Sequence, residues 1–208
     1  MFSLILCTYN RAESLAETLR SINAQVVPAE FRGEILVVDN NSKDKTRQAV
    51  EFFAGMSRWP VRYIFEVKQG LSHARNAGIL AARGDVLGFL DDDVLVEPGW
   101  MAAMDKLFRE TDADMAGGKI LRRWDCKAPD WYTEEVGGPL IGQDYGPERK
   151  SDFRKGQYLI GASMAFRKSI FDKTGFSKED FSGEKTNRIL KLKNLIEKNI
   201  LDNNLRFI

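Results

Sequence analysis

The sequence predicts an α/β protein with one mostly parallel sheet flanked by helices. Over residues 2–90, short apolar segments alternate with segments whose apolar residues recur at helical spacing, the order expected when helices connect parallel strands. The apolar segment 85–90 ends directly in three aspartates, 91–93. Carboxylates that follow a buried strand lie at the carboxyl edge of the sheet, where open α/β folds bind their ligands.

Four strands and three helices are expected in this half of the chain. The strands are short and rich in Val, Ile, Leu and Phe, as buried parallel strands are, and we expect them at 2–9, 34–39, 61–65 and 85–90. The helices should follow Asn10, follow Ser42 and cover 72–82. Asn and Ser commonly cap helix N-termini, so we expect Asn10 and Ser42 to cap the first two helices.

The second half of the chain has a less regular pattern. We expect a helix over 98–110, a strand over 157–166 and a helical turn over 168–173. The segment 125–156 between them carries three of the six prolines and several glycines. Long irregular segments inside compact domains are usually functional, so we expect 125–156 to form a flap that faces the substrate.

The length favours one domain, which we expect over 1–184. A chain of 208 residues with 43% hydrophobic residues buries one sizeable core. The segment 185–208 is rich in Lys and Asn and has apolar residues on one helical face. A helix of this kind usually closes a fold, but its excess of positive charge leaves a membrane-surface helix, and so peripheral membrane contact, as an alternative.

Composition excludes several classes of function. The 31 basic and 30 acidic residues nearly cancel, leaving a net charge of +1, so nucleic acid is not an expected partner. Two cysteines and one histidine provide neither a disulfide framework nor a multi-histidine metal site. No apolar stretch reaches the roughly 18 residues of a membrane span, and the N-terminus lacks the basic flank of a signal peptide. We therefore expect a cytoplasmic protein.

Four segments together resemble the inverting glycosyltransferases of family 2. They follow the first two strands, lie in the third helix and end the fourth strand, at 7–11, 37–46, 74–78 and 90–93. Their order and placement match the family across about residues 2–175. The resemblance implies the GT-A fold, a Rossmann-like, mostly parallel sheet flanked by helices. It also implies polysaccharide biosynthesis by inverting transfer of a sugar from a nucleotide-diphosphate donor, first of all a UDP-sugar, to a glycan or lipid-linked acceptor.

The resemblance places the donor site at the strand ends. It gives Asp39 a contact with the nucleobase or ribose, for which a carboxylate is a suitable acceptor. Arg75 would pair with phosphate oxygens, as a planar guanidinium does well; a salt bridge on the helix surface is the alternative. The other residues expected to bind the donor are Thr8, Tyr9, Asn10, Arg11 and Asn41.

The acidic triplet is read in this family as an Asp-x-Asp motif. The resemblance directs Asp91 or Asp92 toward the ribose and makes Asp93, together with Asp91, the ligands of Mg²⁺ or Mn²⁺. Such ions favour a few carboxylates plus phosphate oxygens, and they stabilise negative charge on a departing nucleoside diphosphate. Taken without its neighbours, the triplet would be a solvated acidic turn.

The sequence departs from the family where the catalytic base is expected. Gly175-Phe176 matches the family, but Lys185 stands where the family has the Asp that deprotonates the acceptor. Glu184 and Asp180 are the nearby carboxylates that could replace it, and the segment that follows suggests a truncated or altered C-terminus. One alternative is therefore a nucleotide-sugar-binding protein with impaired chemistry. A sugar-phosphate nucleotidyltransferase is a weaker alternative, because 7–11 lacks the Gly-rich phosphate loop of that class.

Overall fold

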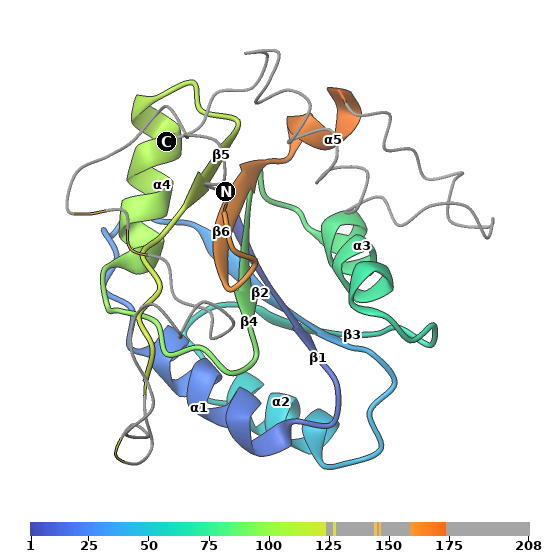
Figure 1. Ribbon diagram of the computed structural model, residues 1–208. Helices are drawn as coiled ribbons and strands as arrows, with labels where there is room; N and C mark the ends of the chain where they lie inside the picture. The colour runs from blue at the N-terminus through green and yellow to red at the C-terminus, as the bar shows by residue number, and fades with distance from the viewer. Residues whose placement is uncertain (124–126, 128–143, 145, 147–158, 174–208) are drawn as a thin grey trace.

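The computed structural model describes residues 1–123, 127, 144, 146 and 159–173 (Figure 1). These residues form a six-stranded sheet with the strand order β3-β2-β1-β4-β6-β5. The strands β1 to β4 are parallel, and β6 runs antiparallel to both β4 and β5. The strand bounds are β1 Phe2–Thr8, β2 Gly33–Asp39, β3 Val61–Phe65, β4 Val86–Asp91, β5 Met115–Gly117 and β6 Ser163–Arg167. The predicted fold class is confirmed.

Helices cover both faces of this sheet. Their bounds are α1 Ala12–Asn23, α2 Thr46–Ala54, α3 Leu71–Ala81, α4 Trp100–Glu110 and α5 Ser169–Lys173. One apolar core lies between the sheet and α1, α2 and α4, and a second lies between the sheet and α3 and α5. Figure 1 shows α1 and α2 on one side of the sheet and α3 on the other. Because strand side chains alternate between faces, Leu4 and Leu6 enter the first core and Ile5 enters the second.

The sequence predicted the strands of five or more residues in the first half of the chain accurately. The first four strands lie within one residue of their expected bounds. The strand β5 was not predicted, because three residues carry too little pattern. The strand expected over 157–166 is shorter in its described part, since the backbone N–H of Ser163 donates to Ile160 O and closes a turn before β6.

The predicted caps of the first two helices are wrong. The helices α1 and α2 begin later, and neither Asn10 nor Ser42 caps them. Asp44 binds both helix starts instead: its Oδ2 accepts from the N–H of Ala12 at 3.0 Å and its Oδ1 from the N–H of Thr46 at 3.0 Å. A carboxylate can serve two neighbouring helix ends because it accepts several hydrogen bonds at once.

Some expectations concern residues that the structure does not describe. Most of the expected flap, 125–156, and all of the segment 185–208 lie outside the described residues. The domain boundary at residue 184 stays a prediction for the same reason. None of the helices that the structure describes is both long and apolar enough to cross a membrane.

Candidate functional site at the carboxyl edge of the sheet

The carboxyl ends of the parallel strands bring the predicted site residues to one edge. In the strand register Thr8 lies beside Asp39, and Cys7 lies beside Asp91. Asp39 in turn lies beside Phe65, the last residue of β3. The ends of β1, β2 and β4 therefore place the acidic triplet and Asp39 along the same edge, as the alternating pattern predicted.

Two arginines form ion pairs with the acidic triplet. Arg11 Nη1 lies 3.2 Å from Asp92 Oδ1 and 2.7 Å from Asp93 Oδ2. Arg75 Nη2 lies 3.5 Å from Asp91 Oδ1. Asp92 is buried, whereas the side chain of Asp93 is about half exposed. The triplet is thus not a simple solvated turn, because each of its carboxylates faces a guanidinium.

The arginines do not remove the electrostatic cost of the triplet. Burial raises the pKa of Asp91 above its usual value, and the negative charges of Asp93 and Asp92 add to this, against the opposing effect of Arg75. Burial also raises the pKa of Asp92, although the nearby Thr8 hydroxyl and Arg11 work in the other direction. Each shift disfavours the charged carboxylate. A further cation at this edge would therefore be stabilised.

The helix α3 places Arg75 by packing unusually close to the sheet. Ala74 is fully buried, and a Cβ added to Gly78 would lie 2.5 Å from Cγ2 of Ile5. A Cβ added to Gly161 would lie 2.6 Å from Arg75 Nη2. Two glycines therefore leave room for the helix and for its guanidinium. Arg75 forms its ion pair with Asp91 at the end of β4, and its pairing with phosphate oxygens stays a prediction.

Asp39 is buried and hydrogen-bonded within the protein. It is 2% exposed; its Oδ1 accepts from the backbone N–H of Ser42 at 2.8 Å, and its Oδ2 accepts from the hydroxyl of Tyr63 at 2.6 Å. Burial, followed by the contact with Asp39, raises the pKa of Tyr63 well above its usual value. Since a carboxylate accepts about four hydrogen bonds, each oxygen of Asp39 retains acceptor capacity. Tyr63 was missed because nothing in its strand pattern distinguishes it from a packing residue.

The loops after β1 and β2 are joined by hydrogen bonds. The N–H of Asn10 donates to Ser42 Oγ at 2.9 Å, and the N–H of Lys43 donates to Asn10 Oδ1 at 2.7 Å. Asn10 and Asn41 both have positive φ, at 52° and 68°, a conformation that Asn tolerates better than most residues. Tyr9, between these loops and β1, is 46% exposed.

Asn40 joins the next loop to this group. Its Oδ1 accepts from the N–H of Gly70 at 2.7 Å, and its Nδ2 donates to the backbone oxygens of Glu66 at 3.2 Å and Lys68 at 2.6 Å. Gly70 has a φ of 133°, which favours glycine. Asn40 was also missed, because its neighbour Asp39 offered the stronger chemical signal.

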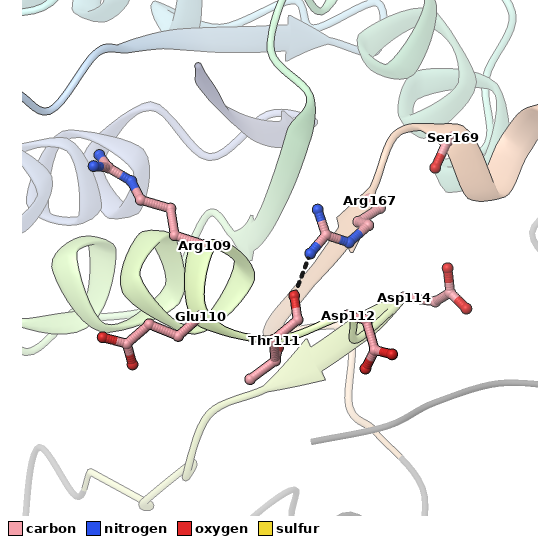
Figure 2. Close-up of a pocket in the computed structure, with 7 residues that line it drawn as sticks. All are labelled: Arg109, Glu110, Thr111, Asp112, Asp114, Arg167 and Ser169. Carbon is pink, nitrogen blue, oxygen red and sulfur yellow. Dashed lines mark hydrogen bonds between the residues drawn. The ribbon is translucent and has the colours of Figure 1, made fainter.

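A hollow elsewhere on the molecule is not part of this edge. It has a volume of about 680 Å³ and is lined by the residues that Figure 2 labels, which include Arg109, Asp114 and Arg167. Arg167 pairs with Val86 at the start of β4, at the opposite end of that strand from Asp91. Its guanidinium donates to the backbone oxygens of Phe108, Thr111 and Ala113. These bonds secure the end of α4, which explains the arginine without a ligand.

The acidic triplet fits a divalent cation when water or a bound phosphate supplies further oxygens. Among the residues that the structure describes, no three His, Cys, Asp or Glu side chains converge on one metal position. Mg²⁺ and Mn²⁺ sites often use one or two carboxylates together with substrate phosphates and water. The carboxylates of Asp91 to Asp93 match that donor set. Asp180, Glu184 and Lys185 lie outside the described residues.

The sheet order and the acidic edge are those of the GT-A fold, as two solved structures show. The described structure resembles residues 1–349 of S. aureus TarS with a TM-score of 0.64 and 22% identity, covering 84% of this chain and 49% of that one. It also resembles the mannosyltransferase PcManGT of Pyrobaculum calidifontis with a TM-score of 0.60 and 20% identity, covering 84% and 46%. The sequence profile described as Glycosyl transferase family 2 matches residues 3–175, so the chain belongs to that family.

Curated relatives are similar over part of their length. The succinoglycan biosynthesis protein ExoM of Rhizobium meliloti is 35% identical over 126 residues, which cover 61% of this chain and 40% of ExoM. The glucosyl-dolichyl phosphate glucuronosyltransferase of Haloferax volcanii is 30% identical over 176 residues, which cover 81% and 53%. The chain thus spans about half the length of these relatives.

Proposed function

We propose that this chain transfers a sugar, with inversion, from a nucleotide-diphosphate donor to a glycan or lipid-linked acceptor with the help of Mg²⁺ or Mn²⁺. The observation that carries the proposal is the row of carboxylates at the ends of β2 and β4, with Arg11 and Arg75 beside it. Carboxylates for a metal and guanidiniums for phosphates are the groups that a nucleoside diphosphate requires.

The donor would lie along the loops that follow β1 and β2. Asp39 has the acceptor capacity for a nucleobase or ribose contact, and Arg75 lies near enough to the triplet to reach phosphate oxygens. The remaining pocket residues that we propose are Thr8, Tyr9, Asn10, Arg11 and Asn41. A UDP-sugar is our first choice, because TarS has been solved with UDP and with UDP-GlcNAc.

Asp93 and Asp91 would hold the cation, with Asp92 directed toward the ribose. PcManGT has been solved with GDP-Man and Mn²⁺, which supports a divalent ion in this fold. When bound, such an ion stabilises the negative charge of the departing nucleoside diphosphate. The protein contributes the carboxylates that fix the ion and the guanidiniums that balance the remaining charge.

The acceptor and its base are proposals from the sequence. The Haloferax volcanii relative is named for glucosyl-dolichyl phosphate, a lipid-linked sugar, which supports a lipid-linked acceptor. A cytoplasmic location with peripheral membrane contact stays a proposal from the sequence. We propose Asp180 or Glu184 as the base. Lys185, at the position of the family's Asp, favours a second candidate function: a protein that binds the donor and transfers the sugar poorly.

Calorimetry tests the donor proposal. UDP should bind wild-type protein at least about tenfold more tightly with Mn²⁺ than in EDTA, and Asp93→Asn should remove most of this difference because one metal ligand is lost. Equal UDP affinity with and without Mn²⁺ in the wild type would contradict metal-dependent donor binding. Asp105→Asn on α4 is a control that should leave both affinities unchanged.

An assay of sugar transfer separates the two candidate functions. UDP release from UDP-glucose or UDP-GlcNAc would be followed with a lipid-linked acceptor pool, for wild type, Glu184→Gln and Asp180→Asn. Loss of a positioned base costs roughly 10²- to 10⁴-fold in rate, so one of these variants should be that much slower. Donor binding without measurable transfer would establish the impaired alternative.

A further inference from the structure

Arg11 lies against two carboxylates of the acidic triplet. Its Nη1 lies between Asp92 Oδ1, at 3.2 Å, and Asp93 Oδ2, at 2.7 Å. These carboxylates belong to the triplet that we propose to bind the metal. A guanidinium beside these carboxylates opposes the binding of a metal ion to them, because both groups are cationic.

The Arg11 guanidinium can exchange Asp92 and Asp93 for another anionic partner. Both contacts come from the single nitrogen Nη1, so Arg11 does not form the two-nitrogen fork that makes Arg–carboxylate pairs strong. Its side chain is 54% exposed and that of Asp93 is 55% exposed, which screens the attraction. Arg75, by contrast, is 13% exposed and lies against Gly161.

The backbone of Arg11 is held while its side chain extends into solvent. Its carbonyl oxygen accepts from the N–H of Leu15 at 2.9 Å in the first turn of α1. The next residue, Ala12, donates its N–H to Asp44 Oδ2 at 3.0 Å. The guanidinium can therefore leave the carboxylates by side-chain rotation alone, without unfolding the loop.

We propose that Arg11 is an internal counter-ion that weakens metal binding to the empty site and moves to the diphosphate when the donor arrives. This inference rests on the proposed function and adds a coupling between the two ligands. A diphosphate offers Arg11 an anionic partner to replace Asp92 and Asp93, which frees Asp93 for the metal and Asp92 for the ribose. Nucleotide and metal then raise each other's affinity by the same factor, as linkage requires.

The test measures each ligand alone. Binding of Mn²⁺ without nucleotide, by electron paramagnetic resonance, and of UDP in EDTA, by calorimetry, is compared for wild type, Arg11→Gln and Arg11→Lys. Arg58→Gln, which removes an exposed guanidinium stacked on Trp59, is the matched control, and thermal unfolding checks that each variant is folded. We expect Arg11→Gln to bind Mn²⁺ alone about tenfold more tightly and UDP alone about tenfold more weakly. Arg11→Lys, which keeps the charge, should lie closer to wild type.

The two outcomes for Arg11→Gln are distinct. An unchanged or weaker affinity for Mn²⁺ alone would overturn the counter-ion role, even if the wild type binds UDP and transfers sugar. A tighter affinity for Mn²⁺ in a protein that transfers no sugar would uphold the counter-ion role and count against the proposed function. The result for Arg11 therefore does not depend on the assay of sugar transfer.

Discussion

The hydroxyl of Tyr63 donates a hydrogen bond of 2.6 Å to Asp39 Oδ2, from the middle of β3 to the end of β2. Tyr63 lies beside Val37 in the strand register, so its ring reaches along the sheet to a residue two positions further on. The bond fixes the orientation of a buried carboxylate whose other oxygen accepts from the N–H of Ser42. Asp39 is thus held at the edge of the site by two donors from different elements.

Tyr63→Phe should weaken binding of the nucleoside part of the donor. The variant removes one hydrogen bond to a charged group, which is worth about 1.5 kcal/mol, and Asp39 becomes free to turn away from the nucleoside. We expect UDP affinity to fall by roughly tenfold while pyrophosphate affinity stays the same, both measured by calorimetry. A similar loss for the two ligands would show that the bond supports the whole edge rather than the nucleoside end.

Gly161→Ala should disturb Arg75 without disturbing the core. The added Cβ would lie 2.6 Å from Arg75 Nη2, and the far end of a long side chain moves easily. We expect thermal stability to change little and the affinity for UDP with Mn²⁺ to fall by roughly tenfold, because a charge-assisted hydrogen bond is worth about 1.5 kcal/mol. Gly99→Ala, where an added Cβ meets nothing within 4 Å, is the control. Unchanged UDP affinity in Gly161→Ala would remove Arg75 from the donor site.

Glu34 should make the fold sensitive to acid. Burial alone would raise the pKa of Glu34, but hydrogen bonds from the Arg83 N–H, Ser3 Oγ and Arg62, together with the charge of Arg62, hold it below its usual value of 4.5. A depressed pKa in the folded state stabilises the protein at pH values above 4.5, and this stabilisation is lost as the pH falls through the folded-state pKa.

Denaturant unfolding at several pH values tests this expectation. Glu34→Gln should lower the free energy of unfolding by about 1 to 3 kcal/mol at pH 7, because buried donors lose their charged partner. The same variant should show a smaller loss of stability than wild type between pH 4.5 and lower pH. Glu30→Gln, at an exposed glutamate, should keep the wild-type dependence on pH. Parallel pH curves for wild type and Glu34→Gln would contradict this role of Glu34.

The strands and the site edge were predictable because their signals are local. A buried strand needs only a short apolar run, and Asp91 follows such a run directly, so its place at the sheet edge follows from parallel order. The contacts of the site were not predictable in the same way. Arg11 and Asp92 are 81 positions apart in the chain, and the pairing of β1 with β4, which sets Cys7 beside Asp91, brings them together. Asn10 and Ser42 were expected to cap helices, but they bind each other's loops because two strand ends lie side by side.

The hydrogen bonds of Asn40 connect the two ends of the proposed donor site. Asn40 follows Asp39 directly, and its side chain accepts a hydrogen bond from the N–H of Gly70, the residue before the first residue of α3. The same helix carries Arg75 into the acidic edge. One asparagine therefore connects the strand end that we propose to recognise the nucleobase with the helix that we propose to meet the phosphates. A substitution that changes the nucleobase preference at this edge should then also change the affinity for the diphosphate.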